Sequence, residues 1–134
     1  MKKAEAESRA VLVVDDEEPV RKFVERVLRE AGYKTSMAGS GSEALDIAAQ
    51  LSSLDVLVTD VMMPQMAGGE LARRLRQAQP SVKVLYLTGY ADHLFKEKAM
   101  LWEDEAYLEK PCTIKALLEA VSLLLYGRFE TRTN

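Results

Sequence analysis

Several polar side chains that can do chemistry follow apolar segments of strand length in this chain. They are Asp15 and Asp16, Asp60, Thr88 and Lys110, next to apolar segments that end near residues 14, 59, 87 and 108. The carboxyl ends of parallel strands lie at one edge of a sheet, so residues far apart in sequence can meet there. The pattern therefore predicts one acidic crevice that contains all of these side chains.

Carboxylates that crowd at one edge repel each other, so such a site favours either protonation or a hard cation that lets all three stay ionised. Mg²⁺ fits such a site, because it prefers oxygen ligands in octahedral geometry and keeps several of its waters. Taken singly, each residue has an ordinary alternative: an acidic helix start, a turn residue, or an exposed lysine before a proline. Their combination at the ends of four strands favours a Mg²⁺ site.

Strand-like and helix-like segments alternate five times along the sequence. The first helix begins near Pro19 and stops near Gly32, and the second opens with Ser40 and Glu43 as a capping box. Further helices are expected from after Gly68 and Gly69 to Pro80, over 91–102 and over 114–125, and strands over 11–14, 34–38, 56–59, 83–87 and 106–108. The central strands lack polar alternation, as in sheets that helices cover on both faces. We therefore expect a doubly wound α/β domain over 10–127, with flexible tails at 1–9 and 128–134.

Composition limits the partners. The chain has 134 residues, of which 48% are hydrophobic, and its net charge of -3 provides no basic stripe for direct nucleic-acid binding. A single cysteine fits a reducing compartment. No apolar run is long enough to insert into a membrane, and the first residues lack the apolar stretch of a signal peptide, so a cytoplasmic location is expected.

Four segments resemble the receiver domains of bacterial two-component response regulators: VLVVDDEEPVR, VLVTDVMMPQMAGGEL, VLYLTGY and AYLEKP. Together they extend over roughly residues 10–126. The resemblance implies a flavodoxin-like (βα)5 fold whose five-stranded parallel sheet has the order 2-1-3-4-5. It also implies a phosphorelay switch, not a turnover enzyme, whose partner is a sensor histidine kinase or a histidine phosphotransfer protein.

By the same resemblance, Asp60 is the phosphoacceptor and attacks a phosphohistidine to form an aspartyl phosphate. Asp16, Asp60 and the backbone carbonyl of Met62 would bind Mg²⁺ directly, and Asp15 would act mainly through bound water. The side chains of Met62 and Tyr90 would flank the approach of hydrolytic water. Neither orients water as a small polar residue does, so slow self-dephosphorylation is expected.

The resemblance further implies that the Thr88 hydroxyl and the Lys110 ammonium contact the phosphoryl group. Tyr107 would be the switch aromatic; the alternative is that it is an ordinary core residue. Met100 and Leu101 are apolar but lie off the stripe of the helix over 91–102, so they either cover a loop or form a contact surface. Receivers often dimerise through their fourth helix, fifth strand and fifth helix, and this chain is expected to offer the same face.

Three other interpretations remain. A haloacid-type aspartyl-phosphate hydrolase would need a DxD pattern after the first strand, which Asp15-Asp16-Glu17 does not supply. A phosphorylation-independent interaction module is an alternative, although no site residue is missing. The segments DVMMPQMAGGEL and LTGY also resemble receivers of hybrid sensor histidine kinases. The sequence leaves open whether this receiver belongs to a longer kinase.

Overall fold

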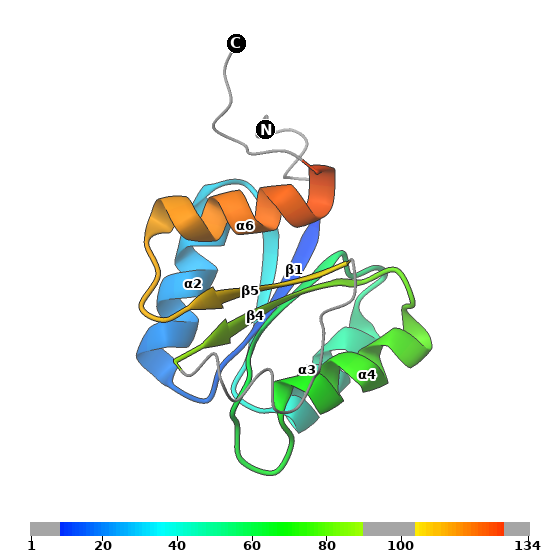
Figure 1. Ribbon diagram of the computed structural model, residues 1–134. Helices are drawn as coiled ribbons and strands as arrows, with labels where there is room; N and C mark the ends of the chain where they lie inside the picture. The colour runs from blue at the N-terminus through cyan, green and yellow to red at the C-terminus, as the bar shows by residue number, and fades with distance from the viewer. Residues whose placement is uncertain (1–8, 90–103, 128–134) are drawn as a thin grey trace.

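The computed structural model describes residues 9–89 and 104–127, which fold around one parallel sheet (Figure 1). Its strands are β1 (Ala10–Val14), β2 (Lys34–Ala38), β3 (Val56–Asp60), β4 (Lys83–Thr88) and β5 (Glu105–Glu109). Their spatial order is β2-β1-β3-β4-β5, as predicted. The chain moves outward from β1 to β2 and then crosses to β3 on the other side. The strand order therefore reverses between β1 and β3, where doubly wound folds place their ligand crevice.

Helices cover both faces of this sheet. They are α2 (Glu18–Glu30), α3 (Gly41–Gln50), α4 (Gly68–Ala78) and α6 (Ile114–Tyr126). In Figure 1, α2 and α6 lie on one face, and α3 and α4 lie on the other. The predicted α/β architecture is thus confirmed. The helix expected over 91–102, which includes Met100 and Leu101, lies outside the described residues.

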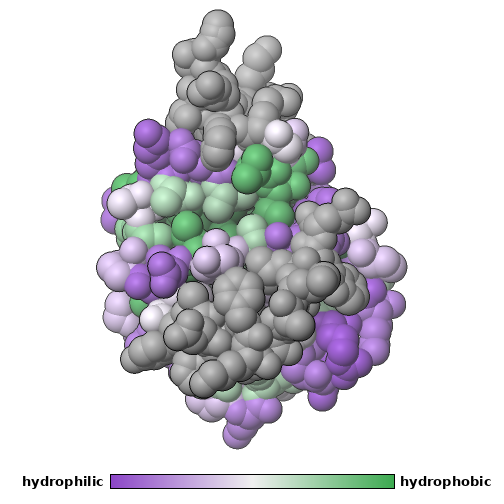
Figure 2. Space-filling model, in the orientation of Figure 1, coloured by the Kyte–Doolittle hydropathy of each residue, from purple (hydrophilic) through white to green (hydrophobic). Residues whose placement is uncertain are grey.

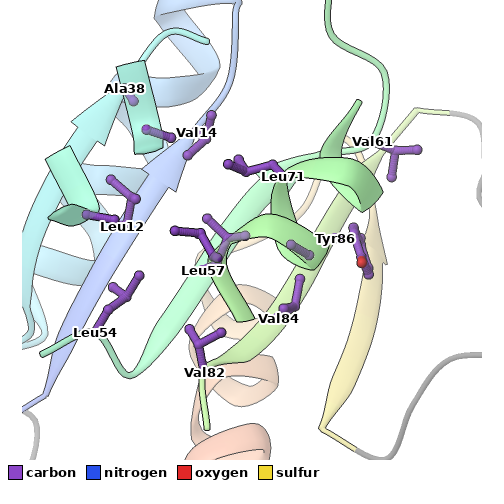
Figure 3. Close-up of a cluster of buried hydrophobic side chains, with 14 residues drawn as sticks. Leu12, Val14, Ala38, Leu54, Leu57, Val61, Leu71, Val82, Val84 and Tyr86 are labelled. Atoms are coloured by element: carbon purple, nitrogen blue, oxygen red, sulfur yellow. The ribbon is translucent and has the colours of Figure 1, made fainter. Parts of the chain in front are cut away.

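Side chains of β1 alternate between two separate hydrophobic cores. Leu12 and Val14 pack toward α3 and α4, in the cluster drawn in Figure 3. Val11 and Val13 pack toward α2 and α6 on the other face. Burial of both faces explains why the sequence of the central strands shows no polar alternation.

Local signals at the helix ends behave largely as expected. Pro19 lies in the first turn of α2, and Gly32 follows the helix with a φ of 107°. The Ser40 hydroxyl accepts a hydrogen bond from the Glu43 N–H, while the Glu43 carboxylate reaches the N–H of Gly39 and not that of Ser40. The Glu43 carboxylate therefore bonds the N–H one residue before the N-cap, whereas in a standard capping box it would bond the N–H of the N-cap itself.

One boundary differs from the sequence expectation. Gly68 and Gly69 do not precede the third helix, because α4 begins at Gly68 and includes both glycines. The Gly68 N–H donates to the carbonyl of Val61 at 2.9 Å, which brings the start of α4 back against the end of β3.

At the opposite end of the sheet, Arg9 lies over the ring of Tyr126 and pairs with Asp55.

The domain limits of 10–127 and the two tails stay a prediction. Among the residues that the structure describes, no helix has the length and apolar character needed to cross a bilayer.

Candidate functional site

The three aspartates singled out from the sequence meet at the carboxyl edge of the sheet. Asp15 and Asp16 follow β1, and Asp60 is the last residue of β3. One carboxylate oxygen from each lies within 4.8 Å of the others. Asp15 and Asp60 are only 1% and 7% exposed, whereas Asp16 is exposed to solvent. An all-oxygen acidic cluster of this kind suits a hard divalent cation such as Mg²⁺.

Lys110 brings its ammonium group into this acidic cluster. Its Nζ lies 3.0 Å from Oδ2 of Asp15, 3.4 Å from Oδ1 of Asp60 and 3.6 Å from Oε1 of Glu17. The Lys110 N–H donates to the carbonyl of Thr88 at 2.8 Å, which joins the ends of β4 and β5 beside the aspartates. Lys110 therefore lies within the acidic cluster and is not an ordinary exposed lysine.

Asp15 and Asp16 differ in their hydrogen bonds and ion pairs with the rest of the protein. Oδ1 of Asp15 accepts a hydrogen bond from the N–H of Glu17 at 2.9 Å, and its Oδ2 accepts one from Lys110. Within the described part of the chain, the Asp16 carboxylate has no hydrogen bond or ion pair with the protein. Asp16 thus keeps its oxygens available to an ion, while both Asp15 oxygens already have protein partners.

Burial and charge shift two pKa values at the site. Burial, reinforced by the charge of Asp15, raises the pKa of Asp60 from 3.8 to about 6, although Lys110 opposes the shift. Burial alone would lower the pKa of Lys110, but its bonds to Asp15 and Asp60 outweigh burial, and the pKa lies above its ordinary value. The site therefore favours an ammonium ion, and its negative charge favours an added cation.

The remaining predicted residues lie around this centre. Thr88 ends β4 and is 1% exposed. Met62 is 47% exposed, and Tyr107 on β5, opposite Tyr86 of β4, is 40% exposed. Tyr90 lies outside the described residues. The structure thus brings Thr88 and Lys110 to the aspartates and leaves much of the Tyr107 side chain accessible.

A cleft of about 740 Å³ opens beside the acidic cluster. Asp16, Asp60, Met62 and Lys110 line its polar end. Its other walls are mainly apolar and come from α2, the end of β4 and the segment after β5; they include Pro19, Val20, Phe23, Val24, Leu87, Pro111 and Cys112. The site can therefore accommodate a polar reacting group that an apolar surface presents.

Sequence reasoning missed three residues that support the site. Glu17 contacts Lys110 and also donates its N–H to Asp15. Arg21 donates from Nη1 to the carbonyl of Asp15 at 2.8 Å. A Cβ atom on Gly68 would lie 2.2 Å from the carbonyl oxygen of Asp60, so only glycine allows this close approach. The double glycine before the helical pattern was the one available signal.

Residues 11–122 match the family model described as the response regulator receiver domain. The chain belongs to this family. This receiver is 38% identical to the sensor kinase CckA of Brucella abortus. The match covers 88% of this chain but only 13% of CckA. It is 30% identical to the response regulator receiver protein CpdR of the same organism, over 86% of this chain and 95% of that one. The solved chemotaxis response regulator CheY4 of Vibrio cholerae matches with a TM-score of 0.76 and 34% identity, over 87% of this chain and 98% of that chain.

Family membership and fold together establish a phosphorelay receiver function for this domain. Receiver domains are phosphoacceptor switches that interact with histidine kinases or phosphotransfer proteins, and they generally bind Mg²⁺. The acidic cluster of this receiver has the donor set for that ion.

Proposed function

We propose that this receiver accepts a phosphoryl group from a phosphohistidine on Asp60, in a Mg²⁺-dependent reaction, and then changes conformation to signal. One observation carries the proposal: Asp60 lies where the acidic pair of β1 and the ammonium of Lys110 converge. A nucleophilic carboxylate next to a cation and a metal-binding acid pair is what phosphoryl transfer to aspartate requires.

In the reaction, an oxygen of Asp60 forms a bond to phosphorus as the phosphorus–nitrogen bond to the donor imidazole breaks. Asp60 must be ionised to attack, and with a pKa of about 6 it is mostly ionised at neutral pH. Lys110 already lies 3.4 Å from Asp60 and can neutralise charge on the transferred oxygens. Mg²⁺ bound by Asp16, Asp60 and the Met62 carbonyl, with Asp15 acting through water, would add positive charge at the same place.

The apolar wall of the cleft supports a protein donor, namely a sensor histidine kinase or a histidine phosphotransfer protein. Phe23 is 41% exposed, and it lines the cleft together with Val20 and Pro111. An apolar surface next to a reactive polar centre can hold a helical donor while its histidine reaches Asp60. Small phosphodonors would use the polar end alone.

After transfer, the Thr88 hydroxyl and the Lys110 ammonium would bind the new phosphoryl oxygens. Thr88 is the last residue of β4, and Tyr107 of β5 lies opposite Tyr86, two residues before Thr88. Movement of Thr88 toward the phosphoryl group would open space that the ring of Tyr107 could fill. A domain whose conformation responds to phosphorylation in this way is a switch and not a turnover enzyme. A phosphorylation-independent interaction module would not show this coupling.

The phosphorylated state should decay slowly. Water must approach the phosphorus in line, and the side chains expected beside this path are those of Met62 and Tyr90. The thioether of the exposed Met62 is only a weak hydrogen-bond acceptor. Met62→Asn combined with Tyr90→Glu should therefore speed loss of the phosphoryl group several-fold, and unchanged decay would exclude these side chains as the cause.

The wider setting of the domain is also a proposal. CpdR and CckA offer two precedents, because this chain spans 95% of the first but 13% of the second. The receiver could thus act alone or within a hybrid histidine kinase. We place the domain at 10–127, in the cytoplasm, without direct contact to nucleic acid or insertion into a membrane.

A homodimer through the predicted fourth helix, β5 and α6 belongs to the same proposal. Hydrophobic side chains gather over α6 in Figure 2. Tyr107 of β5 and Ile114 and Leu123 of α6 are exposed. Phosphorylation that repositions Tyr107 would change this surface. Leu123→Lys should then weaken dimerisation in light-scattering measurements without changing phosphorylation.

The central test uses phosphoramidate, a small phosphorus–nitrogen donor, with Mg²⁺. Intact-mass spectra should show one added phosphoryl group on the wild type and on Asp46→Asn, an exposed control on α3. Asp60→Asn should show none. Equal labelling of Asp60→Asn would refute the acceptor assignment.

A further inference from the structure

Arg21 extends from α2 back toward the loop that carries the acidic pair. Its own N–H donates to the carbonyl of Glu17 at 3.0 Å, as part of the first turn of the helix. Its side chain is half-buried, and Nη1 donates to the carbonyl oxygen of Asp15 at 2.8 Å. One residue therefore joins the start of α2 to the backbone between the acidic residues.

The same guanidinium lies against the loop that follows β2. A Cβ atom on Gly39 would lie 3.1 Å from Nη1 of Arg21, so the guanidinium packs closely on the Gly39 backbone. This neighbouring loop is itself fixed, because the Gly39 N–H donates to Glu43 at 2.7 Å and the Asp15 N–H donates to the carbonyl of Ala38 at 3.2 Å. Arg21 thus has firm support on the side away from Asp15.

The carbonyl that Arg21 binds belongs to the peptide group between Asp15 and Asp16. Peptide groups are planar, so holding this oxygen also sets the direction in which Asp16 leaves the loop. Asp15 has further anchors through its carboxylate, to Glu17 and Lys110. The Asp16 side chain is exposed and has no such anchor in the described residues. Its position depends on the backbone alone.

We infer that Arg21 is a positioning residue for the cation site, which holds Asp16 toward Asp60 through the Asp15 carbonyl. This role rests on the proposed function, because it presumes that Asp16 and Asp60 share a Mg²⁺ ion. Mutation of a group that orients a metal ligand typically lowers metal affinity about 10- to 100-fold.

The direction in which Mg²⁺ affinity changes when Arg21 is replaced distinguishes a positioning role from a purely electrostatic one. Arg21 is a cation near an acidic cluster, so removal of its charge should by Coulomb's law strengthen Mg²⁺ binding. Loss of the hydrogen bond to the Asp15 carbonyl should do the opposite, because Asp16 would then sample orientations that do not face Asp60. A weaker affinity in the neutral variant can therefore come only from lost geometry.

Calorimetric titration with Mg²⁺ tests this inference. Arg21→Ala should bind Mg²⁺ about tenfold more weakly than the wild type. Arg21→Lys, which keeps a long donor, should recover part of the affinity. Lys22→Ala is the matched control, because it removes the next positive charge of α2, whose partner is the exposed Glu18. It should bind as tightly as the wild type or slightly more tightly.

Two further readouts keep the outcomes distinct. Metal-free urea unfolding reports any general loss of stability, and the amide NMR signal of Asp16 reports its local geometry, which should change in Arg21→Ala and return toward the wild type in Arg21→Lys. Affinity in Arg21→Ala equal to or above that of the wild type overturns the role of Arg21. Absence of Mg²⁺ binding to the wild type would instead overturn the proposed metal site itself.

Discussion

The ammonium of Lys110 lies 3.0 Å from Oδ2 of Asp15, although 95 positions separate the two residues in the sequence. The contact ties the segment after β5 to the end of β1. Asp15 is almost fully buried, so loss of this partner would leave a buried carboxylate without its cation. The ammonium therefore pairs with the aspartates in this structure, and under the proposed function it would turn to the phosphoryl oxygens after transfer.

Replacement of Lys110 should reveal this dependence. Lys110→Met leaves the carboxylates of Asp15 and Asp60 without their cation, and we expect the metal-free domain to lose about 2 kcal/mol of unfolding free energy at pH 7. The loss should shrink at pH 5, because Asp60, whose pKa would rise further without Lys110, then carries a proton. Urea unfolding of this variant and of Lys115→Met, an exposed lysine of α6, measures the effect. Equal stability of the two variants at pH 7 would contradict the expected role.

Asp60 should itself destabilise the metal-free fold at neutral pH. Its pKa is raised from 3.8 to about 6, so between these values the folded protein binds more protons than the unfolded chain. The stability contributed by this group therefore grows as the pH falls through that interval and is lowest above pH 6. Asp60→Asn should raise the unfolding free energy at pH 7 by up to about 3 kcal/mol, and the gain should vanish near pH 3.5.

Chemical denaturation of Asp60→Asn at several pH values checks this expectation, with Asp46→Asn as the surface control. A gain that persists unchanged at low pH would show that strain or packing, and not the carboxylate charge, causes it.

Removal of Asp16 should weaken the metal site selectively. Asp16→Asn takes away an available ligand oxygen and one negative charge, so Mg²⁺ affinity should fall by at least about tenfold. Glu30→Gln removes an exposed carboxylate whose partner is Arg26 on α2, and it should leave the affinity unchanged. Calorimetry measures both. Indistinguishable affinities would exclude Asp16 as a ligand.

Thr88 should couple the acceptor to Tyr107. A phosphoryl group can favour an active conformation only through contacts that are better in that conformation, here those to Thr88 and Lys110. Thr88→Ala should accept a phosphoryl group or beryllofluoride but show smaller NMR shifts of the Tyr107 ring than the wild type. Thr35→Ala removes a hydroxyl on β2 that bonds Glu25, far from β5 in the sheet, and it provides the control. Full wild-type shifts in Thr88→Ala would rule out this coupling.

The sequence reveals the fold and the site centre for one physical reason. Strand ends in a parallel sheet share an edge, so Asp15, Asp60 and Thr88 can be placed together from apolar patterns alone. Lys110 follows from the same rule, because it comes directly after β5. Family resemblance then adds the order of the strands, which periodicity cannot supply.

Other features leave no such pattern. The bond from Arg21 to the Asp15 carbonyl joins a side chain to the backbone, and it has no periodic signature. The buried ion pair between Arg76 and Glu105 joins residues 29 positions apart, and an acid in a strand does not reveal its partner. The helical periodicity after Gly69 could not show that α4 begins earlier, because that start depends on the close approach of Gly68 to Asp60.

The most direct measurement locates the phosphoryl group on the chain. After reaction with phosphoramidate and Mg²⁺, borohydride reduces an aspartyl phosphate to homoserine, and trypsin should release residues 35–73 as one peptide. Fragmentation of that peptide distinguishes Asp60 from Asp46 and Asp55. We predict homoserine at position 60, only in samples that contained both donor and Mg²⁺. Homoserine at another aspartate, or an unmodified Asp60 in fully phosphorylated protein, would contradict the account.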